Sequence, residues 1–295
     1  MKKIAKISLF MIILIIAIII GHLLYLKSLS ESDSYPLDSF LQSQTNKTAL
    51  IIVAHDDDAI AMSGTIALLC SNGWEVRKLC FYQGWKNKES FRQRDLKNAA
   101  NLLGMASVEY HNIELRKNPQ NIEKPWLPIP FNDFKNAYKT DTALYHIDNF
   151  IKTYNPSVIF TLDDIIGGYG HPDHVLISKL IVDYCKQRLN DSSFKVNAIY
   201  QAVFDPSMNE RILKDTKVFQ LAKEIYQVQS SPKPDVYISL EGYETVKKKA
   251  MLSFTTEQNS LTKIWPFYNY YPANVYFKIF DKEYYRVLKR DEKYR

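Results

Sequence analysis

The chain has 295 residues, of which 46% are apolar and 13% aromatic. These values exclude an intrinsically disordered protein and allow one large domain or two small ones. Most of the net charge of +6 comes from Lys2, Lys3, Lys6 and Lys27, so the remainder of the chain carries only about +2. We therefore expect no nucleic-acid partner.

The four lysines flank an apolar segment, residues 7–26, which has the length needed to cross a bilayer. Three lysines precede the segment and one follows closely, so the positive-inside rule predicts a single-pass protein with a cytoplasmic N-terminus and an extracytoplasmic domain. A cleaved signal peptide is the alternative, but the segment is longer than a usual h-region and no small-x-small cleavage site follows it. We interpret residues 1–27 as a membrane anchor, 28–47 as a polar linker and 48–295 as the folded domain.

Apolar runs and helical patterns alternate from Thr48 onward. Strands are predicted at about 49–54, 75–82, 108–113, 157–162, 196–204 and 235–240. Helices are predicted at about 61–71, 89–103, 140–153, 173–188 and 243–254. This order predicts an α/β, Rossmann-like three-layer fold with a mostly parallel sheet covered on both faces.

Other segments carry weaker signals. The proline-rich residues 116–134 predict a loop, of a length that often faces a substrate. Residues 265–271 are aromatic and could line a sugar site or simply pack. The basic run 247–249 and the tail 286–295 are interpreted as solvated faces. Three cysteines predict buried free thiols, with a Cys70–Cys80 bridge left open.

Two acidic histidine clusters, about 115 residues apart, each follow a predicted buried strand. They are Ala54-His55-Asp56-Asp57-Asp58 and Gly170-His171-Pro172-Asp173-His174. Either cluster alone could be a helix cap with ordinary solvated acids. Active sites of open α/β sheets lie beyond the carboxyl ends of the strands, and imidazole with carboxylate is a typical zinc ligand set. Together the clusters predict a divalent-metal site with acids available for proton transfer.

These residues resemble the PIG-L or LmbE-like zinc-dependent N-deacetylases. The family's motif Ala-His-Pro-Asp-Asp-Glu, followed by a Gly-Gly-Thr-like turn, is similar to residues 54–59 and 63–65, and its Gly-His-Pro-Asp-His motif matches residues 170–174. Weaker similarities lie around Arg92-x-x-Asp95 and near Lys247 and Gln258. The resemblance implies that residues 48–295 form a deacetylase domain.

The resemblance also implies a role for each site residue. It assigns one Zn²⁺ per chain to His55, Asp58 and His174. It makes Asp57 the general base, and His171 the group that stabilises the oxyanion or protonates the leaving amine. Arg92 becomes a substrate contact. Asp173, by its position, either orients a histidine or caps the helix.

The chain departs from the family pattern at two positions of the first cluster. Asp56 replaces the proline and is a possible rival metal ligand, and Ala59 replaces the glutamate and so removes a carboxylate near the site. All presumed ligands and the base remain. The sequence therefore predicts a membrane-anchored amide hydrolase that deacetylates an N-acetylglucosamine-type sugar in a glycan or glycolipid.

Two alternative functions remain open. One is a membrane-anchored glycan-binding protein whose catalysis weakened with the lost glutamate. The other is a metal-dependent phosphohydrolase, which the missing Gly-rich phosphate loop and the three imidazoles disfavour.

Overall fold

The computed structural model describes residues 2–81, 89–118, 124 and 126–295. Within these residues a seven-stranded sheet has the order β3-β2-β1-β4-β5-β7-β6. The strands are Thr48–Val53 (β1), Glu75–Phe81 (β2), Ser107–His111 (β3), Val158–Leu162 (β4), Ala198–Val203 (β5), Val236–Ser239 (β6) and Lys282–Lys289 (β7). Neighbours from β3 to β5 are parallel, and β7 is antiparallel to both β5 and β6. The predicted α/β fold with a mostly parallel sheet is confirmed.

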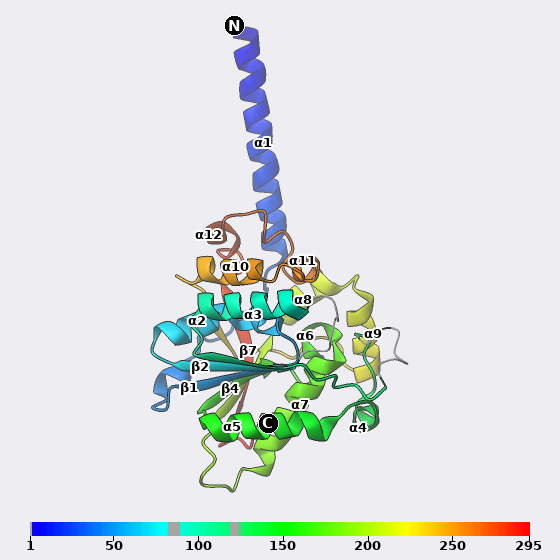
Figure 1. Cartoon of the computed structure of the whole chain (residues 1–295). Helices are drawn as coiled ribbons and strands as arrows, with labels where there is room; N and C mark the ends of the chain where they lie inside the picture. Colours follow the sequence, from blue (N-terminus) through cyan, green and yellow to red (C-terminus); the bar gives the residue numbers. More distant parts are fainter. Residues whose placement is uncertain (1, 82–88, 119–123, 125) are drawn as a thin grey trace.

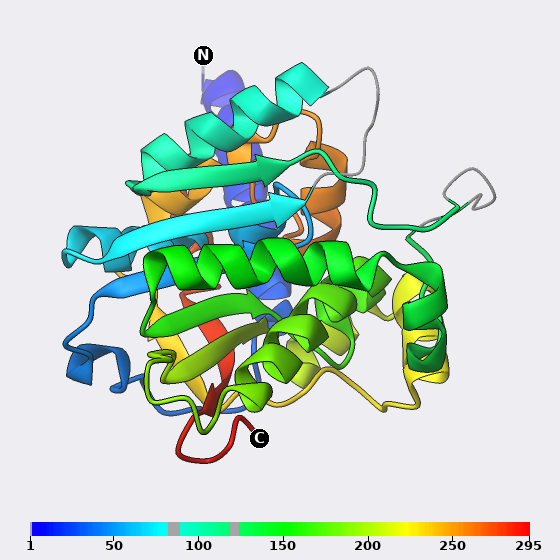
Figure 2. The same cartoon turned by 60° about the horizontal axis from the view of Figure 1, so that its bottom comes forward.

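Helices cover both faces of the sheet. The α-helices of the described residues are Lys2–Leu29 (α1), Ser63–Ser71 (α2), Glu89–Leu103 (α3), Phe134–Ala137 (α4), Thr140–Tyr154 (α5), Gly167–Gly170 (α6), Pro172–Gln187 (α7), Pro206–Leu213 (α8), Lys217–Tyr226 (α9), Glu244–Ser253 (α10), Gln258–Ile264 (α11) and Ala273–Tyr276 (α12). One core packs α2, α3 and α10 against the sheet, and the other packs α5 and α7 against its opposite face. Figure 2 brings the α5 and α7 layer to the front.

The alternation of side chains along β1 explains the two cores. Ala49, Ile51 and Val53 belong to one core, whereas Leu50 and Ile52 belong to the other. A strand buried on both faces must be apolar throughout, which is why its sequence reads as an unbroken run. The chain builds β2 and β3 on one side of β1, then crosses to build β4 and β5 on the other. This reversal opens a crevice at the carboxyl ends of β1 and β4, where such folds bind their ligands.

The interpretation of two basic segments as solvated faces is wrong in part, since Lys249 and residues 291–293 and 295 are exposed but the rest of both segments is buried or half-buried. The tail 286–295 begins inside β7, which lies between β5 and β6, and both Leu288 and Tyr294 are buried. Lys247 is 2% exposed, because its ammonium pairs with Glu283 of β7. The charges in the sequence did not predict solvent exposure here, because the charged groups of one element pair with those of another.

The N-terminal helix α1 projects from the domain on the side of α10, α11 and α12 (Figure 1). Its residues 3–29 are long and apolar enough to cross a membrane, with a mean hydropathy of 3.0 in the most apolar window. The predicted linker, residues 28–47, packs on the domain. Leu37 forms a parallel bridge with Tyr237, and the Tyr200 hydroxyl donates a hydrogen bond to Asp38.

The remaining sequence predictions have mixed outcomes. Cys70, Cys80 and Cys185 are all free. Residues 119–123 and 125 of the predicted 116–134 loop, and residue 82 of the predicted second strand, lie outside the described residues. In the described part of that loop, Arg116 pairs with Tyr138, and the Phe131 ring stacks on that of Tyr226.

Candidate metal-dependent active site

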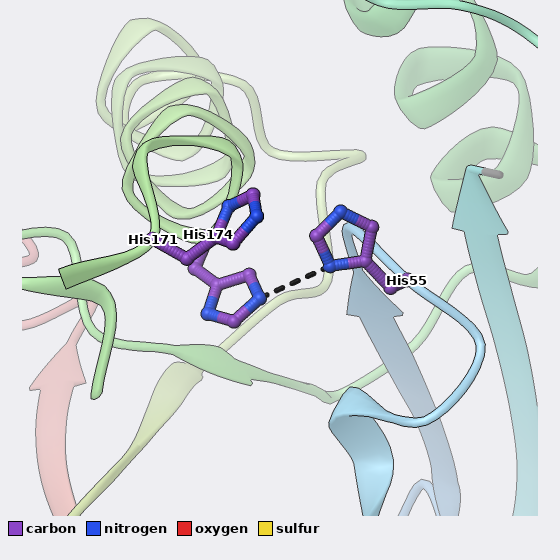
Figure 3. Close-up of side chains that lie close together, drawn as sticks. All are labelled: His55, His171 and His174. Atoms are coloured by element: carbon purple, nitrogen blue, oxygen red, sulfur yellow. Dashed lines mark hydrogen bonds between the residues drawn. The ribbon is translucent and has the colours of Figure 1, made fainter. Parts of the chain in front are cut away.

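The two histidine clusters meet at the crevice between β1 and β4. His55 lies just beyond β1, while His171 and His174 lie at the start of α7, beyond β4. Figure 3 shows the three imidazoles facing one another from these two elements. Their nitrogen atoms lie within 4.8 Å of one another, so this cluster could hold a metal ion.

A tighter set of ligand atoms is formed by His55, Asp58 and His174. His55 Nδ1 lies 3.1 Å from His174 Nε2 and 3.5 Å from Asp58 Oδ1, and His174 Nε2 lies 3.0 Å from Asp58 Oδ1. Ligands bound tetrahedrally at about 2.0–2.2 Å from zinc are about 3.3–3.6 Å apart. The three atoms thus form nearly the triangular face that a zinc ion requires.

Hydrogen bonds outside the triangle fix which nitrogen of each ring faces inward. His174 Nδ1 donates to the Gly167 carbonyl at 3.0 Å, which leaves the Nε2 lone pair in the triangle. His55 Nε2 donates to Asp173 Oδ2 at 3.2 Å, which leaves Nδ1 there. A metal-binding histidine usually makes such a bond with its other nitrogen. Asp173 therefore orients a histidine, one of its two predicted roles.

The electrostatics of the triangle favour a cation. Burial would raise the pKa of Asp58, but His174 and His55 lower it well below its usual range. Burial would lower the pKa of His55, but Asp58 and Asp173 raise it well above its usual range. The raised pKa of His55 reports the negative charge of Asp58 and Asp173 beside this ring, and the lowered pKa of Asp58 shows that its carboxylate stays ionised. An ionised carboxylate among imidazoles suits a divalent metal.

His171 is arranged differently from the other two histidines. Its Nδ1 accepts a hydrogen bond from the Asp173 backbone N–H at 3.2 Å and so caps α7, a role that the sequence suggested for Asp173. Burial lowers the pKa of His171 well below its usual range. The ring is therefore neutral with its proton on Nε2, which makes it a hydrogen-bond donor beside the triangle.

Arg92 ties three carboxylates together next to the triangle. Its Nε donates to Asp56 at 2.9 Å, its Nη2 contacts Asp57 at 3.1 Å, and its Nη1 contacts Glu257 at 2.6 Å. Asp56 is fully buried and faces Arg92, so it does not act as the rival ligand that its position suggested. Arg92 is only 6% exposed. Its buried guanidinium can therefore hold the Asp57 carboxylate in one position.

A cleft of about 760 Å³, including its open mouth, adjoins the site. Asp57, Asp58 and His174 form part of its lining. The rest of its wall is largely apolar and includes Phe204, Met208, Leu261, Ile264 and Trp265. Trp265 thus shows that part of the aromatic segment 265–271 faces the candidate site. Burial raises the pKa of Asp57, which keeps this carboxylate a better proton acceptor than an ordinary aspartate.

Sequence reasoning missed the residues that shape the loop after β4. The Asp163 carboxylate accepts hydrogen bonds from four successive backbone N–H groups, those of residues 165–168. This loop presents the Gly167 carbonyl to His174. Gly167 has a φ of 64°, and a Cβ there would lie 2.8 Å from His174 Cβ. An aspartate directly after a strand and before paired glycines was the available signal.

Comparison with known proteins finds a matching family model and similar solved structures. Residues 50–185 match the family model described as PIG-L, GlcNAc-PI de-N-acetylase. N,N'-diacetylchitobiose deacetylase from Pyrococcus horikoshii has a similar structure, with a TM-score of 0.53 and 16% identity over 86% of this chain and 90% of that one. The zinc-inhibited form of teicoplanin deacetylase gives 0.53 and 13% identity over 82% and 98%. The predicted resemblance to the PIG-L family is confirmed.

One further structural relative has a different activity. The 4-carboxy-2-hydroxymuconate hydratase from Pseudomonas putida KT2440 gives a TM-score of 0.54 at 14% identity, covering 82% of this chain and 96% of that one. At these identities the structural likeness shows the fold alone. The reaction must be argued from the site.

Proposed function

We propose that this chain, a PIG-L family member over residues 50–185, is a zinc-dependent amide hydrolase. Its substrate would be the N-acetyl group of an N-acetylglucosamine-type sugar in a glycan or glycolipid. The observation that carries the proposal is the triangle of His55 Nδ1, Asp58 Oδ1 and His174 Nε2, with Asp57 beside it in the cleft. Two imidazoles and one carboxylate are a typical ligand set of a catalytic zinc.

A zinc ion held there would supply Lewis acidity and would bring the pKa of a water molecule towards about 7. Asp57 is the general base in this proposal. Its raised pKa suits proton acceptance, and the 3.1 Å contact with Arg92 holds the carboxylate in place. Because Asp58 is a metal ligand in this proposal, the neighbouring Asp57 is left to act as the base.

His171 supplies the remaining chemistry. Amide hydrolysis develops negative charge on the carbonyl oxygen, and a fixed donor aimed at that oxygen lowers the barrier. The neutral His171 ring carries its proton on Nε2 because Nδ1 accepts the Asp173 N–H. We assign to it the stabilisation of that oxygen. Proton delivery to the leaving amine then falls to the protonated Asp57.

The cleft supports a substrate with an apolar portion. Beyond Asp57 and His174, its wall continues over Phe204, Leu261 and Trp265. An aromatic face can stack on a sugar ring, and aliphatic walls suit a lipid. We propose that α1 spans a membrane with the N-terminus cytoplasmic, so the substrate would be a cell-surface or lipid-linked glycan.

The alternative, a glycan-binding protein with weakened catalysis, rests on Ala59. This side chain is 5% exposed and packs in the core, so no carboxylate takes the position of the family's glutamate. However, Asp56 supplies a buried carboxylate three residues earlier in the sequence and pairs with Arg92. We infer that this substitution preserves the charge balance around the base.

Acetate release tests the proposal. The purified full chain is incubated with N-acetylglucosamine-bearing glycans and glycolipids, as isolated, after chelator treatment, and after Zn²⁺ is restored. We expect release that the chelator abolishes and zinc restores. Tight sugar binding at full metal occupancy without acetate release would favour the glycan-binding alternative. Release of phosphate in place of acetate would favour the phosphohydrolase.

A further inference from the structure

We propose that the aromatic loop, residues 265–271 between α11 and α12, enters the headgroup layer of the bilayer that α1 crosses. The catalytic domain would then be partly embedded in the membrane surface and not merely tethered to it. This inference rests on the membrane-anchoring part of the proposed function and is independent of the reaction.

The aromatic loop contacts α1 directly. His22 of α1 shares a hydrogen bond with the Tyr271 hydroxyl, and their rings stack at 5.6 Å. The His22 ring also meets the Phe267 ring edge-on at 4.6 Å. In Figure 1 the segment joining α11 and α12 lies beside the base of α1.

The length of the apolar segment then determines how deep the aromatic loop sits. Residues 7–26 make about 30 Å of helix, the thickness of a hydrocarbon core. Only residues 7–21 precede the first contact with the domain, and all of them are exposed. They amount to about 22 Å of helix. If the whole apolar segment is submerged, the aromatic loop at the level of His22 lies about 6 Å inside the end of the span.

Contacts at the base of α1 hold the helix against the domain beside the aromatic loop. Leu26 is fully buried against the domain. Just beyond α1, Lys282 pairs with Glu31 at 2.6 Å, and Arg211 Nη1 donates to Ser32 at 3.0 Å. These contacts attach the residues that follow α1 to β7 and α8.

The exposed side chains of the aromatic loop suit an interfacial position. Tyr270 is 77% exposed and Phe267 39%, and Tyr25 of α1, close to His22 in the helix, is 50% exposed. Large aromatic side chains gather at the headgroup level of membrane proteins. Phe267 also has a φ of 63°, a strained value for a non-glycine residue that places its ring against His22.

The same loop begins at the candidate site. Trp265, its first residue, lines the cleft, and α11 immediately before it contributes Leu261 and Ile264. An embedded loop would therefore bring one wall of the cleft close to the bilayer. A sugar carried on a lipid would then reach the site without leaving the membrane.

Spin-label depth measurements test this proposal with the full chain in phosphatidylcholine vesicles. Labels are placed by Tyr270→Cys, by Tyr145→Cys and by Ile15→Cys, in a Cys70→Ser background because Cys80 and Cys185 are buried. Tyr145 is a matched control, since it is 63% exposed but lies on α5, on the side of the domain away from α1. Position 15 reports whether α1 is in the bilayer at all. Each label is read by its collisions with oxygen, which partitions into lipid, and with an aqueous nickel chelate.

We expect oxygen collisions to dominate at positions 15 and 270, and chelate collisions to dominate at position 145. If position 15 is lipid-exposed but position 270 resembles position 145, the aromatic loop stays in water and the proposal is overturned. If position 15 is itself aqueous, α1 does not span the bilayer, and the anchoring proposal fails together with this one. Neither result bears on acetate release.

Discussion

His55, Asp58 and His174 owe their arrangement to hydrogen bonds that the sequence does not reveal. The motifs name the residues, but the choice of nitrogen on each ring depends on the Gly167 carbonyl and on Asp173. Asp58 in turn accepts the backbone N–H of His55 at 2.7 Å, which closes the turn after β1. The buried strands before both clusters predicted that the clusters meet, and the family resemblance then selected these three residues. It could not predict the tautomers, which depend on long-range contacts.

The two histidines of the second cluster should differ in their effect on metal binding. His174→Ala removes one corner of the triangle, so we expect zinc affinity to fall by at least about 100-fold. His171→Ala should retain most of the zinc, because His171 Nδ1 is engaged as the cap of α7. Metal analysis of the two purified variants checks this. Equal loss of zinc from both would show that the metal binds among the three imidazoles instead.

Arg92 is predicted by family resemblance to contact the substrate, whereas its surroundings favour a positioning role for Asp57. Arg92→Lys keeps the charge but loses the planar fork that contacts Asp56, Asp57 and Glu257 together. If it positions the base, kcat should fall about 10–100-fold with KM nearly unchanged. A raised KM with unchanged kcat would show that Arg92 mainly binds substrate. Steady-state kinetics on one acetylated sugar separates the two roles.

At the scale of elements, the loop between β4 and α7 positions the second cluster. Its turn depends on Asp163 and on positive φ values at Gly167, Gly168 and Gly170. Gly167 leaves no space for a side chain, because a Cβ would also lie 3.0 Å from Val175. The sequence shows the glycines, but the close approach to α7 exists only in the folded chain.

Gly167→Ala should therefore weaken both the fold and the metal site. The matched control is Gly73→Ala, since Gly73 also has a positive φ of 77° but has nothing within 4 Å of its would-be Cβ. We expect the control to lose about 1 kcal/mol, the cost of the backbone strain alone. Gly167→Ala should lose about 1–3 kcal/mol more and bind zinc more weakly. Chemical denaturation and zinc titration measure the two effects, and identical behaviour of the variants would contradict this account.

The pair of β7 and α10 shows where sequence reasoning failed. Glu283 of β7 accepts the backbone N–H groups of Gly64 and Thr65 at the start of α2, and it also pairs with Lys247 of α10. A charged strand following several short helices gave no pattern that distinguishes it from a solvated tail. Its burial depends on partners that are distant in the sequence, 219 residues away for Gly64 and 36 for Lys247.

Lys247→Met should destabilise the fold by about 3–5 kcal/mol, because it leaves Glu283 buried without a counter-charge. The double variant Lys247→Met, Glu283→Gln removes both charges and should recover part of that loss. Urea denaturation of the two single variants and the double variant gives the coupling between them. Strictly additive losses would mean that the two groups do not interact.

At the scale of the whole molecule, the reversal of strand order at β1 and β4 brings together two motifs that are distant in the chain. Alternating strands and helices were enough to predict this fold, since β1 and β4 at its centre are largely apolar runs. The sequence also indicated the apolar helix α1, but not that residues 28–47 would fix it to the domain. The distinction between a flexible linker and a packed one depends on contacts such as Tyr200 with Asp38.

The side of the membrane remains a prediction from the lysines that flank α1. The domain itself holds a candidate metal-binding triangle, a candidate base and an apolar cleft whose wall begins at the aromatic loop. Together they support the proposal of a hydrolase acting close to a membrane surface. The central claim of this proposal is that two neighbouring aspartates have different roles. Asp58 binds the metal, and Asp57 accepts the proton.

Acetate release by the Asp57→Asn variant, measured at the same zinc occupancy as the unaltered chain, tests that claim most directly. The substitution preserves the size of the side chain and keeps an oxygen near Arg92, but the resulting amide cannot accept the proton. We predict full zinc binding with acetate release reduced by about 10²–10⁴-fold. Asp141→Asn, an exposed position on α5, should behave as the unaltered chain. Turnover by Asp57→Asn at the unaltered rate would contradict the account.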